Sequence, residues 1–124
     1  MKLEIVGQSV AAVSAEFTVT IEMGAEFELQ IEGDLTLRTA NGAEFHATSD
    51  DYAAIDSELQ SILGTTVMRA DADEVRGLTL EFDSGAAIHI PVDQHYEAWG
   101  VVGPGGYRVI CMPGGELAIW SARK

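Results

Sequence analysis

The feature that most constrains this chain is that its pattern of apolar residues occurs twice. When the sequence is shifted by 61 positions, seven residues of the first half meet residues of like polarity in the second half. The first set is Phe17, Val19, Ile21, Gly24, Phe27, Leu29 and Ile31, and the second is Leu78, Leu80, Phe82, Gly85, Ile88, Ile90 and Val92. A doubled pattern predicts two like halves, which we place at about residues 7–47 and 64–112 of a single domain spanning residues 1–124.

Within each copy, apolar and polar residues alternate, which is the period of a half-buried β-strand. In the first copy the alternation covers residues 17–21 and 27–31, and Gly24 between them suits a tight turn, expected to be a three-residue loop centred on that glycine. Asn41-Gly42 is a strong hairpin signal and predicts a second pair of strands around it. Gly105-Gly106 lies 64 positions further on, so the second hairpins of the two halves should correspond as well.

One segment departs from this period. Ile55, Leu59, Ile62 and Leu63 fall on one face of a helix, which predicts a helix at about residues 51–63, ended by Gly64. With a single helix, each half would leave one face of its sheet uncovered, so the two halves should pack on each other. The expected fold is therefore mainly β: two pseudo-repeated antiparallel sheets that form a sandwich or a flattened barrel.

The balance of charge is strongly acidic. The chain has 20 acidic and 7 basic residues, for a net charge of −13. Twelve acids and two bases lie in residues 1–64, against eight acids and five bases in residues 65–124. Such a field repels phosphate groups, so we expect neither nucleic-acid binding nor binding to anionic membranes. It would accelerate the encounter with a basic protein, although solubility alone is the plainer interpretation.

The sequence also bears on the compartment. No apolar run reaches the length that a membrane span requires. The first fifteen residues include Lys2 and several small residues, but Glu4, Gly7 and Gln8 interrupt the apolar core that a secretion signal needs. Cys111 is the only cysteine, so no internal disulfide can form. These observations favour a cytoplasmic protein, and no motif predicts a cofactor.

Two groups of residues are candidate sites. Glu22, Glu26, Glu28 and Glu32 alternate on one exposed strand face, where they would present a surface to a basic protein. Asp93, His95 and Glu97 would share a face if their segment were extended, and with Trp99 they predict a small-ligand pocket. A polar loop is the competing interpretation of the second group. We predict no metal site there, because no second cluster of ligands supports one.

Other reactive residue types have plain structural interpretations. Cys111 lies within an apolar strand and is expected to be a buried, inert thiol. His46 and His89 alternate with inward-pointing neighbours, so they should face solvent. No catalytic residue is predicted, since no pattern marks a nucleophile, an activated acid or a phosphate-binding loop.

The most distinctive part of the sequence is its tail, which includes Tyr96-Glu97-Ala98-Trp99, Gly103-Pro104-Gly105-Gly106 and the run from Val109 to Trp120. This tail, together with Gly7-Gln8 near the start, resembles a family of small bacterial proteins of unknown function. The resemblance implies a compact β-rich domain and carries over no activity, cofactor or site residue. Some small proteins of this general type resemble toxin-immunity partners, and the acidic half would suit that role.

Three hypotheses about function follow and stay open at this point. The first is a non-enzymatic, protein-binding module that uses the acidic face, with toxin neutralisation as one form. The second is a homodimer formed through an exposed strand edge, because an open sheet carries unpaired backbone groups. The third is a small-ligand-binding protein or enzyme with its site near Asp93, His95 and Glu97.

Overall fold

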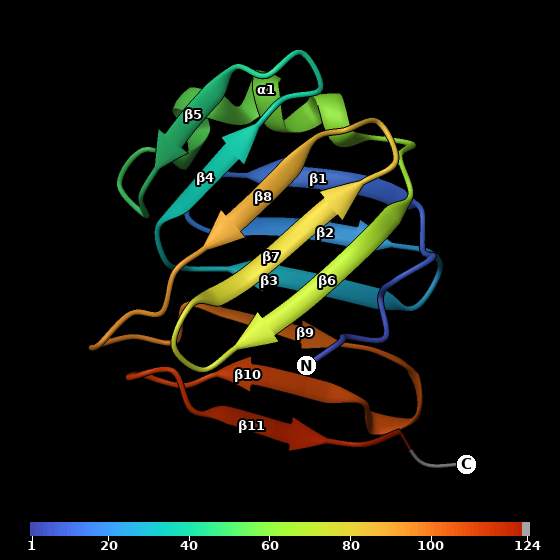
Figure 1. Ribbon diagram of the computed structural model, residues 1–124, viewed down its shortest axis with the longest axis vertical. Coiled ribbons are helices and arrows are strands. Elements are labelled where there is room, and N and C mark those ends of the chain that lie inside the picture. Colours follow the sequence, from blue (N-terminus) through green and yellow to red (C-terminus); the bar gives the residue numbers. More distant parts are fainter. Residues whose placement is uncertain (123–124) are drawn as a thin grey trace.

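The chain folds into two antiparallel sheets that face each other across an apolar core. A computed structural model describes residues 1–122, and Figure 1 shows its two sheets crossing obliquely. The six-stranded sheet has the order β1-β2-β3-β9-β10-β11, and the five-stranded sheet has the order β5-β4-β8-β7-β6. The sheets stay separate, so the architecture is a sandwich and not a flattened barrel. The strands are β1 (Val10–Ala15), β2 (Val19–Met23), β3 (Phe27–Ile31), β4 (Leu35–Arg38), β5 (Glu44–Ala47), β6 (Val67–Asp73), β7 (Gly77–Phe82), β8 (Ala87–Ile90), β9 (Trp99–Val102), β10 (Arg108–Cys111) and β11 (Leu117–Trp120).

The core forms because the alternating apolar residues of both sheets point inward. Leu29, Leu80 and Ile90 have no exposed surface, as the doubled alternation predicts. The inward-facing residues of the two sheets belong to one apolar cluster. The segment before β1 joins it, because the Leu3 and Ile5 side chains are fully buried beside β6.

Both halves repeat the same meander. Strands β1, β2 and β3 pair in sequence, as do β6, β7 and β8. Each meander has an irregular register at the same place, between Val10 and Ala12 in β1 and between Val67 and Arg69 in β6. The second hairpins also correspond, since β9 and β10 begin and end 64 positions after β4 and β5. The internal repeat is therefore visible in the strand pairing.

The alignment of the two meanders differs by two positions from the one that the sequence predicts. Met23 pairs with Phe27 across the β2–β3 turn, and Phe82 bonds to Ala86 across the β7–β8 turn, so the offset between these turns is 59 and not 61. A shift of two residues keeps every side chain on the same face of a strand. Apolar alternation alone therefore does not distinguish the two alignments.

The two-residue difference accounts for a wrong prediction at Phe17. The predicted partner of Phe17 was Leu78, but Val19 is the residue of β2 that occupies the corresponding buried position. Phe17 lies in the turn between β1 and β2, and 89% of its surface is exposed. Gly24 and Gly85 are likewise not equivalent. Gly24 is the first residue of the three-residue loop between β2 and β3, whereas Gly85 is the last residue of the three-residue loop between β7 and β8. The prediction that the first loop is centred on Gly24 is therefore wrong.

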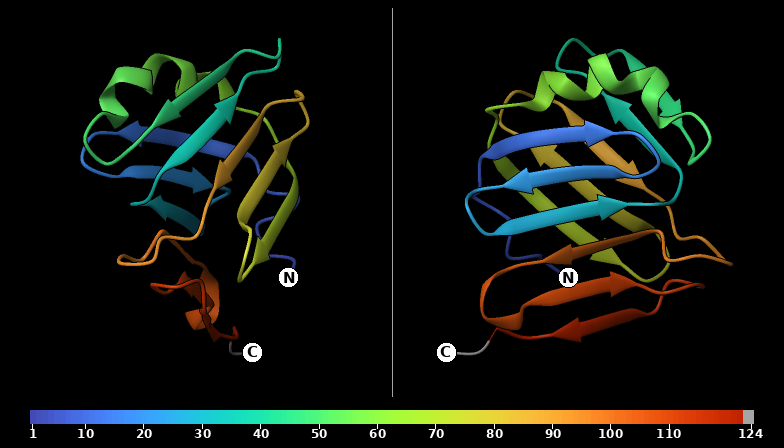
Figure 2. Two further views of the ribbon diagram at one scale, coloured as in Figure 1. Left: turned by 60° about the vertical axis from the view of Figure 1, so that its left-hand side comes forward. Right: turned by 180° about the vertical axis from the view of Figure 1, so that it is seen from behind.

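The hairpin that follows each meander crosses to the opposite sheet. β4 leaves the first meander and pairs with β8 of the second, with β5 on its other side. Likewise, β9 leaves the second meander and pairs with β3 of the first, with β10 and β11 following beyond it. Figure 2 shows this exchange from two sides. Each sheet therefore contains strands from both halves of the chain.

The predicted helix is present as an eleven-residue helical segment. It consists of η1 (Tyr52–Ile55), α1 (Asp56–Leu59) and η2 (Gln60–Ile62), so only its middle turn is an α-helix. Ile55, Leu59 and Ile62 are buried as expected, but 45% of the Leu63 surface is exposed because the helical path ends before it. The segment covers the end of the sandwich above β1 and β5 (Figure 1).

Candidate functional site

The outer faces of the two sheets carry charge in different ways. On the five-stranded sheet, the Arg69 guanidinium lies 3.0 Å from a Glu81 carboxylate oxygen and 3.4 Å from one of Asp71. On the same face, Arg38 of β4 lies directly opposite Glu44 of β5. The acidic groups of this face thus have cationic neighbours.

The outer face of the six-stranded sheet brings carboxylates together. Glu22 of β2 lies directly opposite Glu28 of β3, and like charges in that position repel each other. The same cross-strand row continues through Val102 to Arg108 of β10. Among residues 1–122, no acid of this face takes part in an ion pair. The sheet therefore tolerates a concentration of negative charge that its own residues do not neutralise.

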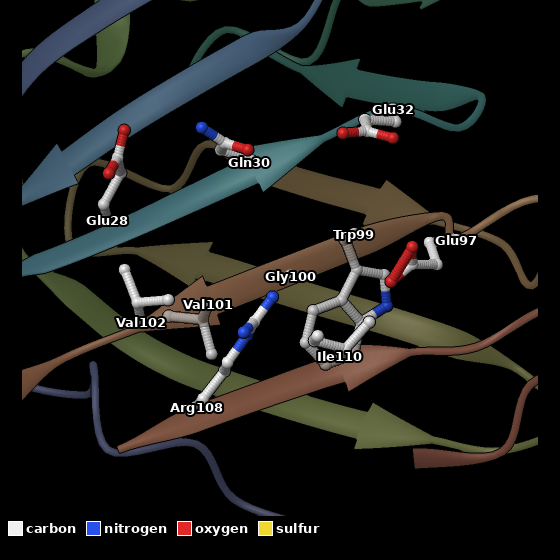
Figure 3. A pocket seen from close by; sticks show the side chains of 10 residues that line it. All are labelled: Glu28, Gln30, Glu32, Glu97, Trp99, Gly100, Val101, Val102, Arg108 and Ile110. Carbon is white, nitrogen blue, oxygen red and sulfur yellow. The ribbon is translucent and has the colours of Figure 1, made fainter. Parts of the chain in front are cut away.

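A groove of about 240 Å³ crosses this face over β3, β9 and β10 (Figure 3). Its acidic side chains come from Glu28, Glu32 and Glu97, and its one cationic side chain from Arg108. The residues that line it are Glu28, Gln30, Glu32, Glu97, Trp99, Gly100, Val101, Val102, Arg108 and Ile110. The groove is thus acidic at its rim and partly apolar along its floor.

Gly100 gives the groove its depth. It lies between Gln30 of β3 and Ile110 of β10, in a cross-strand row where every other strand would project a side chain outward. A Cβ atom placed on Gly100 would lie 3.7 Å from Ile110 Cγ1, which is an ordinary contact. The backbone therefore does not require a glycine here, and the missing side chain leaves open space.

Trp99 is one of the residues around the groove, and its side chain also belongs to the apolar core. Only 2% of its surface is exposed, and its indole nitrogen is buried with no hydrogen-bond partner among the described residues. A buried, unpaired N–H group costs about 1–3 kcal/mol. Figure 3 places Glu97 and Ile110 at the same end of the groove as the indole.

Arg108 is positioned away from a direct ion pair. Its guanidinium carbon lies 5.6 Å from the centroid of the Trp120 ring, which is within the range of a cation–π contact. Trp120 lies opposite Arg108 on β11. Figure 3 shows the Arg108 side chain extending from β10 toward Gly100 of β9, and among residues 1–122 no ion pair joins it to an acid of the groove.

Some residues of the predicted acidic face and some of the predicted small-ligand pocket lie together in the structure. Glu28 and Glu32 from the acidic face and Glu97 and Trp99 from the predicted pocket line one groove. Glu22 lies beside it on β2, but Glu26 lies in the turn before β3 and so is not on the strand face.

Asp93 and His95 do not line the groove with Glu97 and Trp99. Residues 91–98 are not in a strand, so the extended spacing that would align these side chains is not present. An Asp93 carboxylate oxygen accepts hydrogen bonds from the backbone N–H groups of His95 and Tyr96, at 2.8 and 3.0 Å. The Asp93 side chain therefore organises a turn, and the His95 side chain is exposed.

The remaining reactive residues have structural surroundings. Cys111 is buried, and its burial raises the pKa of the thiol. His46 is exposed and His89 half-buried, with their Nδ1 atoms 2.8 and 3.3 Å from the hydroxyls of Thr36 and Thr79. Within residues 1–122, no group of three or more potential ligand side chains is arranged to hold a metal ion.

Sequence reasoning missed the groove residues Gln30, Gly100, Arg108 and Ile110. Their proximity depends on the pairing of β3 with β9, which joins strands about seventy residues apart in the chain. The one signal in the sequence was Gly100 itself, since a glycine inside a strand often marks a close approach or an open space on a sheet.

The chain is thus a two-sheet β protein with an acidic groove on one outer face. Residues 1–121 match the model of the Family of unknown function (DUF6188), and the chain belongs to that family. A search of the curated proteins found no match, and neither did a search of the solved structures. Within the described residues, no helix has the length and apolar character needed to cross a bilayer.

Proposed function

We propose that this protein is a non-enzymatic binding module whose acidic groove receives a basic segment of another protein. The observation that carries the proposal is the direct pairing of Glu22 with Glu28 beside the groove, without a cation from the described residues to neutralise them. Opposed carboxylates lower the stability of a sheet. A cationic partner would remove that repulsion, so part of its binding energy comes from strain that the free protein already carries.

The shape and chemistry of the groove favour a peptide segment over a bare cation. The groove has an apolar floor at Val102 and Ile110 next to its acidic rim, so it can contact aliphatic stems as well as charged ends. A lysine- or arginine-rich segment offers both the charged ends and the aliphatic stems.

Neutralisation of a basic toxin is one form of this function. The acidic half of the chain would accelerate the approach of a basic protein, and the groove would cover a cationic surface that the toxin needs for its own activity. The net charge of −13 supports this form.

A fluorescent lysine- and arginine-rich peptide is the probe for the proposal. We expect it to bind the full chain, and the double variant E28Q/E32Q to bind it at least tenfold more weakly. The matched control is E16Q/E116Q, which removes the same charge from two exposed turn positions away from the groove. Fluorescence anisotropy at low and high salt measures both, and we expect the affinity to fall steeply with salt because the contact is electrostatic.

Equal weakening by the control variant would show that net charge alone attracts the peptide, and would reject the groove as a site. A binding constant that does not change with salt would reject the electrostatic mechanism. A pull-down from cell extract with the full chain and with E28Q/E32Q then identifies the natural partner, as a protein retained by the first and lost with the second.

A further inference from the structure

We propose that a second copy of this chain pairs antiparallel with β11, at the free edge of the six-stranded sheet. This inference concerns a surface other than the groove and does not depend on the proposed function. Figure 1 shows β11 as the outermost strand of its sheet, next to β10.

The hydrogen bonds show which backbone groups of β11 are free. In the turn between β10 and β11, the Met112 N–H donates to the Glu116 carbonyl, at 2.8 Å. Because bonding alternates along an antiparallel pair, Ala118 and Trp120 bond to β10 while Leu117 and Ile119 point their backbone groups outward. The Leu117 N–H donates to Glu74, at 3.1 Å. The Leu117 carbonyl and both Ile119 groups have no partner among residues 1–122.

The other three sheet edges are covered or charged. The edge of β1 meets Gly64 and the Gln60 side chain, which donates to the Val13 carbonyl at 2.7 Å. The edge of β6 is paired with the N-terminal segment through Leu3. The edge of β5 carries Glu44, and a charged side chain discourages strand pairing. β11 combines what these edges avoid: its four residues are uncharged, and the Leu117 carbonyl and the Ile119 backbone groups have no partner among residues 1–122.

β11 also exposes apolar side chains on both of its faces. It lies beyond the cover of the five-stranded sheet (Figure 2), so Ile119 on the inner face is 49% exposed and Trp120 on the outer face is 50% exposed. Monomeric proteins protect a strand edge of this kind with charge, proline or a covering loop. The side chains would be shielded on both faces by an added strand.

The sequence of β11 complements itself. If two copies pair antiparallel about Ile119, each Ile119 exchanges its free N–H and carbonyl with Ile119 of the other copy. Trp120 of one copy then lies opposite Ala118 of the other, so a large side chain meets a small one on the outer face. A two-fold axis generates both contacts from one patch, which is the usual symmetry of a homodimer. This complementarity favours a second copy over an unrelated strand as the occupant.

The test is the mass of the full chain in solution at micromolar concentration, measured by sedimentation with I119P and I119T. Proline removes the outward N–H without breaking a bond to β10, so I119P should keep the fold and become monomeric. Threonine keeps the N–H and the β-branched shape, so I119T should remain dimeric. We expect the dimer fraction of the unmodified chain to rise with salt, because each copy carries a net charge of −13 that salt screens.

A monomer under all of these conditions would overturn the proposal, and so would a dimer that survives I119P. If I119P and I119T are both monomeric and folded, side-chain contacts and not the backbone edge hold the copies together, and strand pairing is rejected. Circular dichroism and thermal unfolding establish that each variant is folded. The variant E28Q/E32Q should stay dimeric, so failure of this proposal and failure of the groove proposal give different results.

Discussion

At the scale of single residues, Gly100 links the stability of the fold to the groove. A glycine inside a strand destabilises it by about 0.5–1 kcal/mol relative to alanine. The position has room for a side chain, because a Cβ atom on Gly100 would lie 3.7 Å from Ile110 Cγ1, its nearest neighbour. At Gly77, in contrast, a Cβ atom would lie 2.0 Å from the Ile90 carbonyl oxygen, so that glycine is required by packing.

We therefore predict that G100V raises the free energy of unfolding by about 0.5–1 kcal/mol and weakens binding of the basic peptide at least tenfold. The valine fills the floor of the groove without displacing the backbone. Chemical denaturation and fluorescence anisotropy measure the two effects on the same sample. Unchanged peptide affinity in a folded G100V protein would mean that the peptide does not occupy the groove.

Tyr52 provides a pH dependence with a defined sign. Its hydroxyl donates to the Gly33 carbonyl, and burial, followed by the charges of Asp34, Glu32 and Asp51, raises its pKa well above the ordinary value of 10.0. The folded protein thus keeps a proton that the unfolded chain releases near pH 10. The stability that this group contributes is complete below that pH and is lost as the pH rises toward the folded-state pKa.

Unfolding experiments between neutral and strongly alkaline pH should show this loss in the unmodified chain. In Y52F the free energy of unfolding should fall less steeply with pH. At neutral pH, Y52F should be less stable by about 1–2 kcal/mol, because the Gly33 carbonyl loses its hydrogen-bond donor. Burial also raises the pKa of Tyr107, so Y107F is the control. Y107F should still lose the stability that Tyr52 contributes as the pH becomes alkaline. Parallel curves for Y52F and the unmodified chain would contradict the assignment.

At the scale of elements, the helical segment shows where local patterning is informative and where it ends. Leu59 and Leu63 belong to the same face of an ideal helix, yet Leu59 is fully buried and Leu63 is 45% exposed. The backbone leaves the helical region at Leu63, with φ −53° and ψ 133°. Helical periodicity does not predict this change of backbone direction, because the change depends on how the chain enters β6.

We predict that L59A lowers the free energy of unfolding by about 2–5 kcal/mol, because it leaves a cavity beneath the helical segment. The matched variant L63A should change it by no more than about 0.5 kcal/mol, since it removes an exposed side chain. Urea denaturation compares the two. A large loss in L63A, or a small one in L59A, would contradict the burial of Leu59 and the exposure of Leu63.

The sequence predicted where the strands lie and which way their side chains face better than it predicted which strands pair. Alternation in residues 17–21 and 27–31 predicted which side chains face inward, and the structure confirms it at Ile21 and Leu29 but not at Phe17. Alternation carries no information on which strand pairs with which, so the contact of β3 with β9 was not predictable. The groove depends on that contact, and for this reason its acids were found while its floor at Gly100 was missed.

The residues near both ends of the chain that suggested the resemblance to the family have structural roles. Gly7 has a φ of 90°, and Gln8 packs so close to Gly24 that a Cβ atom there would lie 2.2 Å from the Gln8 side-chain oxygen. Gly115 in the tail lies against the Glu74 carbonyl, where a Cβ atom would be 2.0 Å away. Gly7 therefore supplies a positive φ, and Gly24 and Gly115 allow close approaches, so these residues need no catalytic role to explain them.

At the scale of the whole molecule, the exchange of hairpins makes each half incomplete without the other. Without residues 65–124, β3 lacks its neighbour β9 and β4 lacks its neighbour β8. We predict that fragments 1–64 and 65–124 are each unfolded alone and regain β structure when mixed. Circular dichroism and cooperative thermal unfolding measure this. A fragment that unfolds cooperatively by itself would contradict the proposal that residues 1–124 form a single domain.

The same exchange has a consequence for biosynthesis. The ribosome releases Phe27–Ile31 long before it makes Trp99–Val102, the strand that completes the first sheet. Until then the growing polypeptide presents an open strand edge and a bare apolar layer, which are features that promote aggregation of nascent chains. Translation speed through the second half, and the chaperones that bind emerging polypeptides, should therefore influence the yield of this protein more than they would if each half closed its own sheet.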